Sequence, residues 1–564
     1  MGNIYMSPAL DTIPKRINFL VENYPDRELF VFYQGGTRDP YTPKRLYPLA
    51  GKFAYRLRQK YGFQRNDVIA NTLPNSPERL ITDLGITLAG CVCLNAQILL
   101  ADGSDFFQCS KNSRCRGIVL QPEEDVAAWR LLKSYVTGDV SSLVTELSCA
   151  STPDLTSAIL VSRKSDGLRK PLLEDLRYSD DEVFVDSTIS PDDLLYIFTT
   201  SGSTGYSKLV PRTHTEGIAL AANMQSVRDN SANKEVVLFS DRLLGWPVSF
   251  SYYTYCIGEK RVLLDWFDAS GAIKGDELWE TICKEKCNII CLFPLELSKI
   301  LEYIATTGKT ISKVHTLATG AQPLNKSHLA SMLSIAEQII VVYGSTETGT
   351  MCSGTINNED VDDYFCGKPV DGVQVKVVDE KGEICPSHKT GTVLVKASCA
   401  FTGYLDTLEN TDPNTIKCFT KDGWFNTEDS GYLDEQDNLY VLGRQKDVIL
   451  YGSHVIYPAW LEKKIAQHPN VDEACVLPVP DPIMFHNICA CVKKVIGSDL
   501  NEEKLKTYCE SIFVADLEND LTPMPKFFMV FETLPETATG KMDKQKLRKM
   551  AEEKFGITKA TSQQ

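Results

Sequence analysis

The residues most able to do chemistry stand together in one short segment of the chain. A strand-like apolar run is followed by glycines, hydroxyl side chains and a lysine: Thr200, Ser201, Gly202, Ser203, Thr204, Gly205 and Lys208. Glycines let backbone N–H groups turn inward, hydroxyls donate hydrogen bonds and lysine adds positive charge, so the segment predicts a loop that cradles phosphate. It is not a Walker A motif, because Lys208 lies three residues beyond Gly205. A solvated turn is the alternative, which the segment alone does not exclude.

Five further segments give this loop a context. They are 319–324 (Thr-Gly-Ala-Gln-Pro-Leu), 343–347 (Tyr-Gly-Ser-Thr-Glu), 422–429 (Asp-Gly-Trp-Phe-Asn-Thr-Glu-Asp), 443–447 (Gly-Arg-Gln-Lys-Asp) and 535–541 (Pro-Glu-Thr-Ala-Thr-Gly-Lys). In this order and spacing, the six segments resemble the adenylate-forming superfamily of acyl-CoA synthetases, aryl-CoA ligases, beetle luciferases and peptide-synthetase adenylation domains. The resemblance covers nearly the whole chain and is nearest to fatty acyl-CoA or aryl-CoA ligases.

The resemblance implies a reaction in two steps. A carboxylate oxygen attacks the α-phosphorus of ATP to give an acyl-adenylate and pyrophosphate, and the acyl group then passes to the thiol of coenzyme A. Two anions must be brought together, so cations and backbone donors have to stabilise the developing charge. The expected cofactors are ATP, Mg²⁺ and coenzyme A, and the expected partner is a small-molecule carboxylic acid.

The resemblance also assigns roles to individual residues. The loop from Thr200 to Lys208 would hold the β- and γ-phosphates, and Glu347 would hold Mg²⁺, a cation that favours oxygen ligands. Asp429 would accept hydrogen bonds from the ribose hydroxyls, with support from Arg444. The adenine would lie against Tyr343 and a pocket near it, and the remaining expected nucleotide contacts are Gly320, Ala321, Gln322, Gly344, Ser345 and Thr346.

Two lysines near the end of the chain carry the catalytic and mechanical expectations. Lys541 would lie between the substrate carboxylate and the α-phosphate, where one ammonium can neutralise both developing charges. Lys446 matches the hinge about which the small domain of the family rotates after adenylation. We therefore expect an N-terminal adenylation domain of residues 1–445 and a mobile C-terminal domain of residues 446–564.

The acyl pocket is expected around residue 245. Its candidate residues are Gly245, Trp246, Pro247, Gly320 and Ser345. The segment before Gly245 lacks the histidine or aromatic residue that often gates this pocket in the family. An apolar wall is expected from Trp246, Phe250, Tyr252 and Tyr253, which favours a hydrophobic, fatty-type acid.

Several positions depart from the pattern of the family. Ser207 stands where proline is common, Leu209 where glycine is common, and Glu428 where glycine usually separates Thr from Asp. Three departures in the small domain put the thiol acceptor in question: Leu450, Ser453 and Trp460.

The elements that must position these residues indicate an α/β fold. Leu46, Leu49, Phe53 and Leu57 follow a helical spacing, and a buried strand is expected after Asn66. Further strands are expected at 194–199, 236–239, 288–293 and 338–342, with helix-length segments between several of them. Alternating valines at 373–377 and 393–395 indicate a β-rich subdomain. The prediction is a large N-terminal domain of helix-covered, mostly parallel β-sheets with this subdomain, followed by a small α+β domain.

Composition narrows the classes of function. The 564 residues carry 59 basic and 74 acidic side chains, and the net charge of −15 argues against binding to nucleic acid. No apolar run reaches the roughly 18 residues of a membrane span. The 18 cysteines lack metal or disulfide spacing, and neither terminus carries a recognisable signal, so a cytoplasmic location is expected. The oligomeric state is not readable from the sequence.

Three alternatives remain open at this stage. A luciferase-like oxygenase would use the same motifs and would consume O₂ with light emission. A carrier protein could replace coenzyme A as the acceptor, although no carrier module is present in the sequence. A binding protein without activity would release no pyrophosphate, and the joint presence of Lys541, Glu347, Asp429 and Arg444 argues against it.

Overall fold

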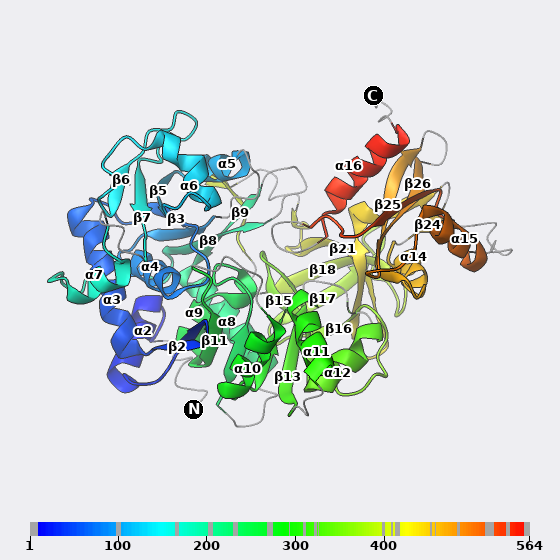
Figure 1. The fold of residues 1–564 in the computed structure, drawn as a ribbon, viewed down its shortest axis with the longest axis horizontal. Coiled ribbons are helices and arrows are strands. Elements are labelled where there is room, and N and C mark those ends of the chain that lie inside the picture. The colour runs from blue at the N-terminus through cyan, green and yellow to red at the C-terminus, as the bar shows by residue number, and fades with distance from the viewer. Residues whose placement is uncertain are drawn as a thin grey trace. The chain divides into compact units, whose positions relative to one another are not determined.

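The computed structural model describes residues 9–96, 103–163, 169–200, 207–228, 235–267, 274–292, 294–307, 312–320, 324, 326–397, 401–407, 410–411, 418–451, 454–456, 458–481, 485–513, 524–536 and 542–557. The chain divides into two compact units (Figure 1). The first unit comprises Met1–Val375 and Val395–Phe425, and the second comprises Lys376–Leu394 and Asn426–Gln564.

One sheet of the first unit contains the strands on either side of the predicted phosphate loop. Its strand order is β20-β19-β9-β8-β4-β3-β5-β7-β6. The central strands run parallel, and β9 returns antiparallel beside β8. The bounds are β3 Val68–Asn71, β4 Val92–Asn95, β5 Cys115–Leu120, β6 Val144–Glu146, β7 Ser157–Leu160, β8 Leu194–Thr200, β9 Lys208–Thr213, β19 Leu405–Thr407 and β20 Asn410–Thr411.

The second sheet of this unit has the order β16-β15-β14-β13-β12-β10-β11-β1-β2. Six neighbouring strands of this sheet pair in parallel: β1, β11, β10, β12, β13 and β14. Their carboxyl ends therefore meet at one edge, where α/β proteins usually bind ligands. The bounds are β1 Phe30–Gln34, β2 Thr37–Tyr41, β10 Val237–Ser240, β11 Lys260–Leu264, β12 Ile289–Cys291, β13 Val314–Gly320, β14 Ala336–Ser345, β15 Gly349–Ile356 and β16 Phe365–Pro369.

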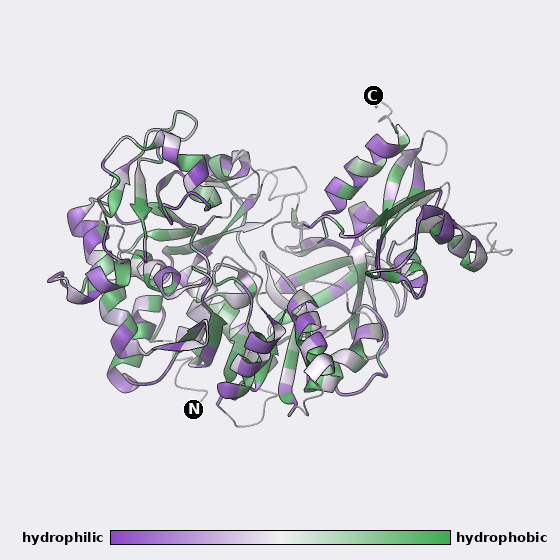
Figure 2. Ribbon diagram, in the orientation of Figure 1, coloured by the Kyte–Doolittle hydropathy of each residue, from purple (hydrophilic) through white to green (hydrophobic). Residues whose placement is uncertain are grey.

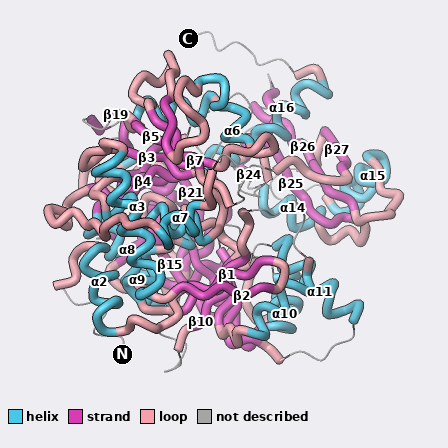
Figure 3. Tube along the Cα trace, turned by 60° about the vertical axis from the view of Figure 1, so that its left-hand side comes forward, coloured by secondary structure: helices cyan, strands magenta, loops and turns pink. Residues whose placement is uncertain are grey.

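The helices of the first unit form layers on the two sheets. Helices α2, α3, α4, α8 and α9 pack between the sheets, because their apolar residues share one core with β1 of one sheet and β8 of the other (Figure 3). Helices α10, α11 and α12 cover the outer face of the second sheet, and α5 and α6 cover that of the first. The bounds are α2 Ile13–Asn23, α3 Pro43–Tyr55, α4 Pro77–Leu88, α5 Ser104–Asn112, α6 Ala127–Leu132, α7 Leu172–Tyr178, α8 His214–Arg228, α9 Tyr252–Ile257, α10 Gly275–Lys284, α11 Pro294–Thr307 and α12 Leu329–Ile335.

Local sequence explains where the helices begin. Thr42 and Ser76 cap α3 and α4 with their hydroxyls, and a proline follows each cap, where its fixed φ suits the first helical turn. Every residue of α4 is buried, as expected for a helix enclosed by other layers. The helix expected from Leu46 onward is confirmed, although Leu57 falls in the π-helical turn Arg56–Lys60. The apolar strands and mixed helix surfaces of this arrangement are visible in Figure 2.

The second unit consists of two β-sheet portions and three helices among its described residues. Strands β17, β18, β21 and β22 follow one another in one sheet, and β24-β23-β26-β25 with β27 form the other. Helices α14 and α15 cover one face of the sheet that contains β23 to β27, and α16 covers the opposite face. The bounds are β17 Val373–Val378, β18 Gly391–Ala397, β21 Phe425–Leu433, β22 Leu439–Arg444, β23 Ile449–Tyr451, β24 His454–Ile456, α14 Pro458–Ile465, β25 Val471–Asp481, β26 Phe485–Lys494, α15 Glu502–Ile512, β27 Phe527–Phe531 and α16 Lys544–Phe555.

The predicted fold class is confirmed. The strands expected at 194–199, 236–239, 288–293 and 338–342 correspond to β8, β10, β12 and β14, and the valine-rich segments form β17 and β18. Residues 376–394 and 426–445 belong to the second unit, whereas the sequence predicted a boundary at Lys446. The boundary at Lys446 was placed at the hinge of an expected rotation of the small domain, and it stays a prediction. Within the described ranges, no helix has both the length and the apolar composition that crossing a bilayer requires.

Candidate active site

The predicted phosphate loop closes the hairpin of β8 and β9. Thr200 and Lys208 are direct partners in the last pair of this antiparallel ladder, so both ends of the loop are fixed opposite one another. The loop residues predicted to contact phosphate lie outside the described residues: Ser201, Gly202, Ser203, Thr204 and Gly205.

Polar contacts hold both ends of this loop. The hydroxyl of Thr199 donates to the carbonyl of Asn95 on β4 at 3.2 Å. After the loop, Ser207 donates to the buried carboxylate of Asp105 twice, through its backbone N–H at 2.6 Å and its hydroxyl at 2.9 Å. Proline could make neither bond, so the serine at this position has a physical reason. Leu209 is buried in the core of the sheet, where a side chain is useful.

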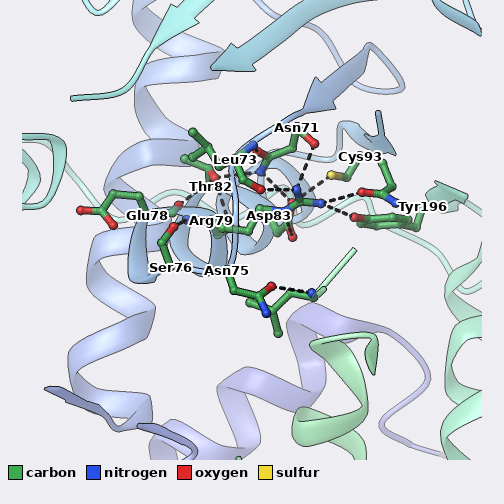
Figure 4. A network of polar contacts seen from close by, with 12 residues as sticks. Asn71, Leu73, Asn75, Ser76, Glu78, Arg79, Thr82, Asp83, Cys93 and Tyr196 are labelled. Atoms are coloured by element: carbon green, nitrogen blue, oxygen red, sulfur yellow. Dashed lines mark hydrogen bonds and ion pairs between the residues drawn. The ribbon is translucent and has the colours of Figure 1, made fainter. Parts of the chain in front are cut away.

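A buried arginine supports the strand that leads into the loop. Arg79 of α4 uses all five N–H donors: its Nε bonds to Asp83, and its other bonds go to the carbonyls of Asn71 and Leu73, the Asn95 side chain and the Tyr196 hydroxyl, at 2.8–3.1 Å (Figure 4). Tyr196 lies on β8 and Asn95 ends β4. A guanidinium with every donor satisfied has none left for a substrate, so Arg79 acts on the framework of the site.

The predicted adenine-side residues lie at the carboxyl edge of the second sheet. Gly320 ends β13 opposite Val342, one residue before Tyr343 on β14. The register of β14 and β15 shifts between Tyr343 and Gly344, and a Cβ at Gly344 would overlap with the carbonyl of Gly349. Gly344 is therefore required by the close approach of the strands. Ala321 and Gln322 lie outside the described residues.

Glu347 stands in the turn between β14 and β15, which three contacts hold in place. Arg212 of β9 donates from Nη2 to the carbonyl of Thr346 at 2.7 Å. The backbone N–H of Phe401 donates to the carbonyl of Glu347 at 2.8 Å. The hydroxyl of Tyr404 donates to Oε1 of Glu347 at 2.6 Å.

The same tyrosine joins Glu347 to the end of the phosphate loop. The ammonium of Lys208 lies 4.6 Å from the centre of the Tyr404 ring. Among the described residues, Lys208 makes no ion pair and Oε2 of Glu347 accepts no hydrogen bond. An ammonium without an acid partner suits phosphate, and a half-buried carboxylate with one oxygen available suits Mg²⁺. The residues present therefore fit Mg²⁺ and a nucleoside triphosphate.

Sequence reasoning missed Asp105, Arg212 and Tyr404. Asp105 is 102 residues from its partner Ser207, and Arg212 is 134 residues from Thr346. Only Tyr404 offered a signal, because it follows a glycine in a short aromatic segment after the β-rich region.

The residues around position 245 are placed less favourably than expected. A Cβ at Gly245 would overlap with the side chains of Asn95 and Arg79, so this glycine permits close packing on the buried network. Trp246 and Pro247 are half-buried. Phe250, Tyr252 and Tyr253 are at most 2% exposed and pack against one another in the core between the sheets, so their burial does not support an acyl-pocket wall. The sequence could not show that α9 and the residues just before it turn these rings toward the core.

The second unit brings together the predicted ribose residues. Asp429 and Arg444 are cross-strand partners on β21 and β22, and their Oδ1 and Nε atoms are 3.1 Å apart. Arg444 also donates to the carbonyl of Thr427 at 2.6 Å. Glu428 has a φ of 59°, a left-handed conformation that explains why glycine is common here.

The remaining predicted residues of this unit are only partly described. Lys446 lies in the 3₁₀ turn Gln445–Asp447, and its side chain is outside the described part. Lys541, Ser453 and the loop 537–541 are also outside it. Trp460 is 45% exposed and packs against Phe513.

The first unit is thus an α/β fold in which a lysine and a glutamate, neither in an ion pair with described residues, lie against one tyrosine. Residues 20–405 match the AMP-binding enzyme family, and residues 461–541 match the AMP-binding enzyme C-terminal domain. The first match covers more than half of the chain, which therefore belongs to the AMP-binding enzyme family. The family predicted from the six segments is confirmed.

Similar proteins span almost the same length. The medium-chain acyl-CoA ligase ACSF2 of Danio rerio, named as mitochondrial, is 25% identical over 97% of this chain and 89% of its own. The 4-coumarate:CoA ligase 1 of Petunia hybrida is 26% identical over 87% of this chain and 85% of its own. The crystal structure of ATP-bound MatB from Rhodopseudomonas palustris has a TM-score of 0.75 at 22% identity and covers 96% of this chain and 99% of its own, so it shows the shared fold.

Proposed function

We propose that this enzyme is an ATP-dependent acid–thiol ligase. A carboxylate oxygen of the acid attacks the α-phosphorus of ATP, the bond to the β-phosphate oxygen breaks, and pyrophosphate leaves. The thiolate of coenzyme A then attacks the acyl carbonyl, AMP leaves, and a thioester remains. Both steps join or create anions, so the rate depends on fixed positive charge and on orientation.

The observation that carries the proposal is the pair of uncompensated charges around Tyr404. Lys208 begins β9 and Glu347 lies in the turn between β14 and β15, yet each lies against the same side chain. An ammonium and a carboxylate that form no ion pair with described residues can bind a phosphate and a metal ion. Glu347 would hold Mg²⁺, which supplies positive charge at the phosphates, and Lys208 would hold a phosphate oxygen.

We propose the remaining roles by analogy with the family to which the chain belongs. Lys541 would bridge the carboxylate and the α-phosphate, and Tyr343 would lie against adenine. Asp429 and Arg444 would hold the ribose, and Lys446 would act as the hinge of a mobile domain that begins there.

We further propose a hydrophobic acid as the substrate. The relatives named above are ligases of medium-chain acyl groups and of 4-coumarate, two acids with an apolar body. Trp246 and Pro247, which are half-buried, are the candidate apolar contacts. The cytoplasm remains the predicted location.

The test measures pyrophosphate and AMP formed from Mg-ATP with a panel of aliphatic and aromatic acids, with and without coenzyme A. We expect acid-dependent release, stimulation by coenzyme A and a thioester detected by mass spectrometry. Lys541→Ala should lower the rate by about a hundred- to a thousandfold. Lys549→Ala, an exposed lysine of α16, is the matched control and should retain the rate.

A folded protein that binds Mg-ATP without releasing pyrophosphate for any acid would contradict the ligase. Oxygen consumption with light emission would favour the oxygenase, and acyl transfer to a carrier protein but not to coenzyme A would change the acceptor.

A further inference from the structure

Tyr404 contacts both Lys208 and Glu347. It follows Phe401-Thr402-Gly403 and precedes β19, and only 4% of its surface is exposed. None of the six sequence segments includes it. The contacts with Glu347 and Lys208 use different parts of the side chain, the hydroxyl and the ring face.

The hydroxyl contact fixes the carboxylate without using it up. A phenol O–H donates one proton, so it can hold only one carboxylate oxygen. At 2.6 Å from Oε1, it is a short hydrogen bond of the kind formed to charged acceptors. Oε2 is left without a hydrogen-bond partner among the described residues, so one oxygen is oriented and the other is available.

The ring contact fixes the lysine without neutralising it. A cation within about 6 Å of an aromatic centre is attracted by the ring quadrupole. The 4.6 Å approach of Lys208 Nζ is well within that range, and an acid at this place would cancel the charge that phosphate requires. The ring holds the ammonium in place without pairing it to an acid.

The position of the tyrosine is itself fixed. Phe401 packs edge-on against the ring with centroids 4.7 Å apart, and its backbone N–H bonds to the carbonyl of Glu347. The segment from Phe401 to Tyr404 therefore holds the Glu347 turn at two points, one on the backbone and one on the side chain.

We infer that Tyr404 is a positioning residue for Mg-ATP, with its hydroxyl orienting Glu347 toward the metal ion and its ring directing Lys208 toward a phosphate. The inference rests on the proposed function, because it assumes that Glu347 and Lys208 meet Mg-ATP. The hydroxyl of Tyr404 acts on Glu347 and its ring acts on Lys208. Substitutions that remove the hydroxyl alone, or the hydroxyl and the ring together, therefore distinguish the two effects.

The experiment is calorimetric titration of the full-length protein with ATP, without Mg²⁺ and over a series of Mg²⁺ concentrations. Tyr404→Phe removes only the hydroxyl and should raise the Mg²⁺ concentration needed for half-maximal ATP affinity by about tenfold or more, while metal-free ATP binding is unchanged. Tyr404→Leu also removes the ring and should weaken ATP binding without Mg²⁺. In a Glu347→Gln background, Tyr404→Phe should cause no further change in Mg²⁺ dependence.

Tyr303→Phe is the matched control, since it removes a 3.2 Å hydrogen bond from a phenol to the carboxylate of Glu280 on distant helices. It should leave the Mg²⁺ dependence unchanged. If wild-type protein shows no Mg²⁺-dependent ATP binding, the proposed function fails together with the role of Tyr404. If wild type shows it and Tyr404→Phe matches wild type, or loses affinity equally with and without Mg²⁺, only the role of Tyr404 is overturned.

Discussion

The two clusters that carry the predicted nucleotide residues hold their charges in different ways. In the first unit, Lys208 and Glu347 contact a neutral tyrosine and make no ion pair among the described residues. In the second unit, Asp429 is paired directly with Arg444 at 3.1 Å. A charge held by a neutral group is not cancelled by a direct ion pair and can bind a ligand, whereas a paired charge has its geometry set before a ligand arrives.

The comparison predicts different consequences of mutation. Loss of an uncompensated charge should act on binding and rate, because the folded protein does not depend on it. Loss of one partner of a paired charge should act on stability as well, since the other partner is left behind.

Glu347→Gln should have the largest effect. Glutamine keeps the shape and can still accept the Tyr404 hydrogen bond, but it removes the negative charge. We expect kcat/KM to fall by about a hundred- to a thousandfold, comparable to the loss of one preorganised electrostatic contact, with little change in Tm. Steady-state pyrophosphate release and thermal melting measure the two quantities. Glu359→Gln, an exposed acid of the same unit, is the control. A large loss of Tm in Glu347→Gln would break the comparison.

Glu285→Gln tests the opposite case, a charge that is fully paired. Burial alone would raise the pKa of Glu285, but hydrogen bonds from Arg38, Lys260 and Tyr33 outweigh it and lower the pKa to about 2. The folded-state pKa is below the unfolded value near 4.5, so the stabilisation is complete above about pH 4.5 and is lost as the pH falls toward 2.

We expect Glu285→Gln to lower the free energy of unfolding by about 1–3 kcal/mol at pH 7, because two cations lose a buried partner. Urea denaturation from pH 7 to pH 3 should show the gap to wild type narrowing below about pH 4.5. Glu302→Gln, an exposed acid of α11, should behave as wild type at every pH. A gap that stays constant with pH would contradict the pairing.

Ser207→Pro tests how the phosphate loop is anchored. The substitution removes both hydrogen bonds to Asp105, a carboxylate that is 4% exposed and has no other partner among the described residues. We expect the KM for ATP to rise by about five- to thirtyfold, corresponding to about 1–2 kcal/mol. Steady-state kinetics with ATP as the varied substrate measures the change.

The double variant Ser207→Pro, Asp105→Ala is the sharper control. Removing both partners of a buried contact costs much less than removing one, so the double variant should recover most of the affinity for ATP. If it is as impaired as the sum of the single variants, Asp105 does not act through Ser207.

The sequence predicted the family and the fold class because both depend on local patterns. The six segments have fixed internal spacing, and strands such as β8 and β14 show as apolar runs. Contacts between distant segments have no such pattern. Tyr404 is 57 residues from Glu347, and Asp105 is 102 residues from Ser207.

The aromatic residues after Gly245 show a second reason why parts of the site could not be predicted from the sequence. Phe250, Tyr252 and Tyr253 are equally suited to a pocket wall and to a core, and only the packing of α9 and the residues just before it between two sheets decides between them. Composition and periodicity say that such residues are buried, but not against what.

Glu428→Gly is the smallest predicted effect and concerns the second unit, beside the paired Asp429. Glu428 has a φ of 59°, and a side chain in this conformation costs about 1–2 kcal/mol. Glycine would remove this strain, but about 0.5–1 kcal/mol of the gain would be lost because glycine has more conformational freedom in the unfolded chain. We expect stability to rise by less than about 1 kcal/mol in urea denaturation. Glu428→Ala keeps the strained Cβ and removes the same charge, so the difference between the two variants isolates the strain. If alanine stabilises the protein as much as glycine does, repulsion between Glu428 and Asp429 is the cause, and the pair with Arg444 does not compensate Asp429 completely.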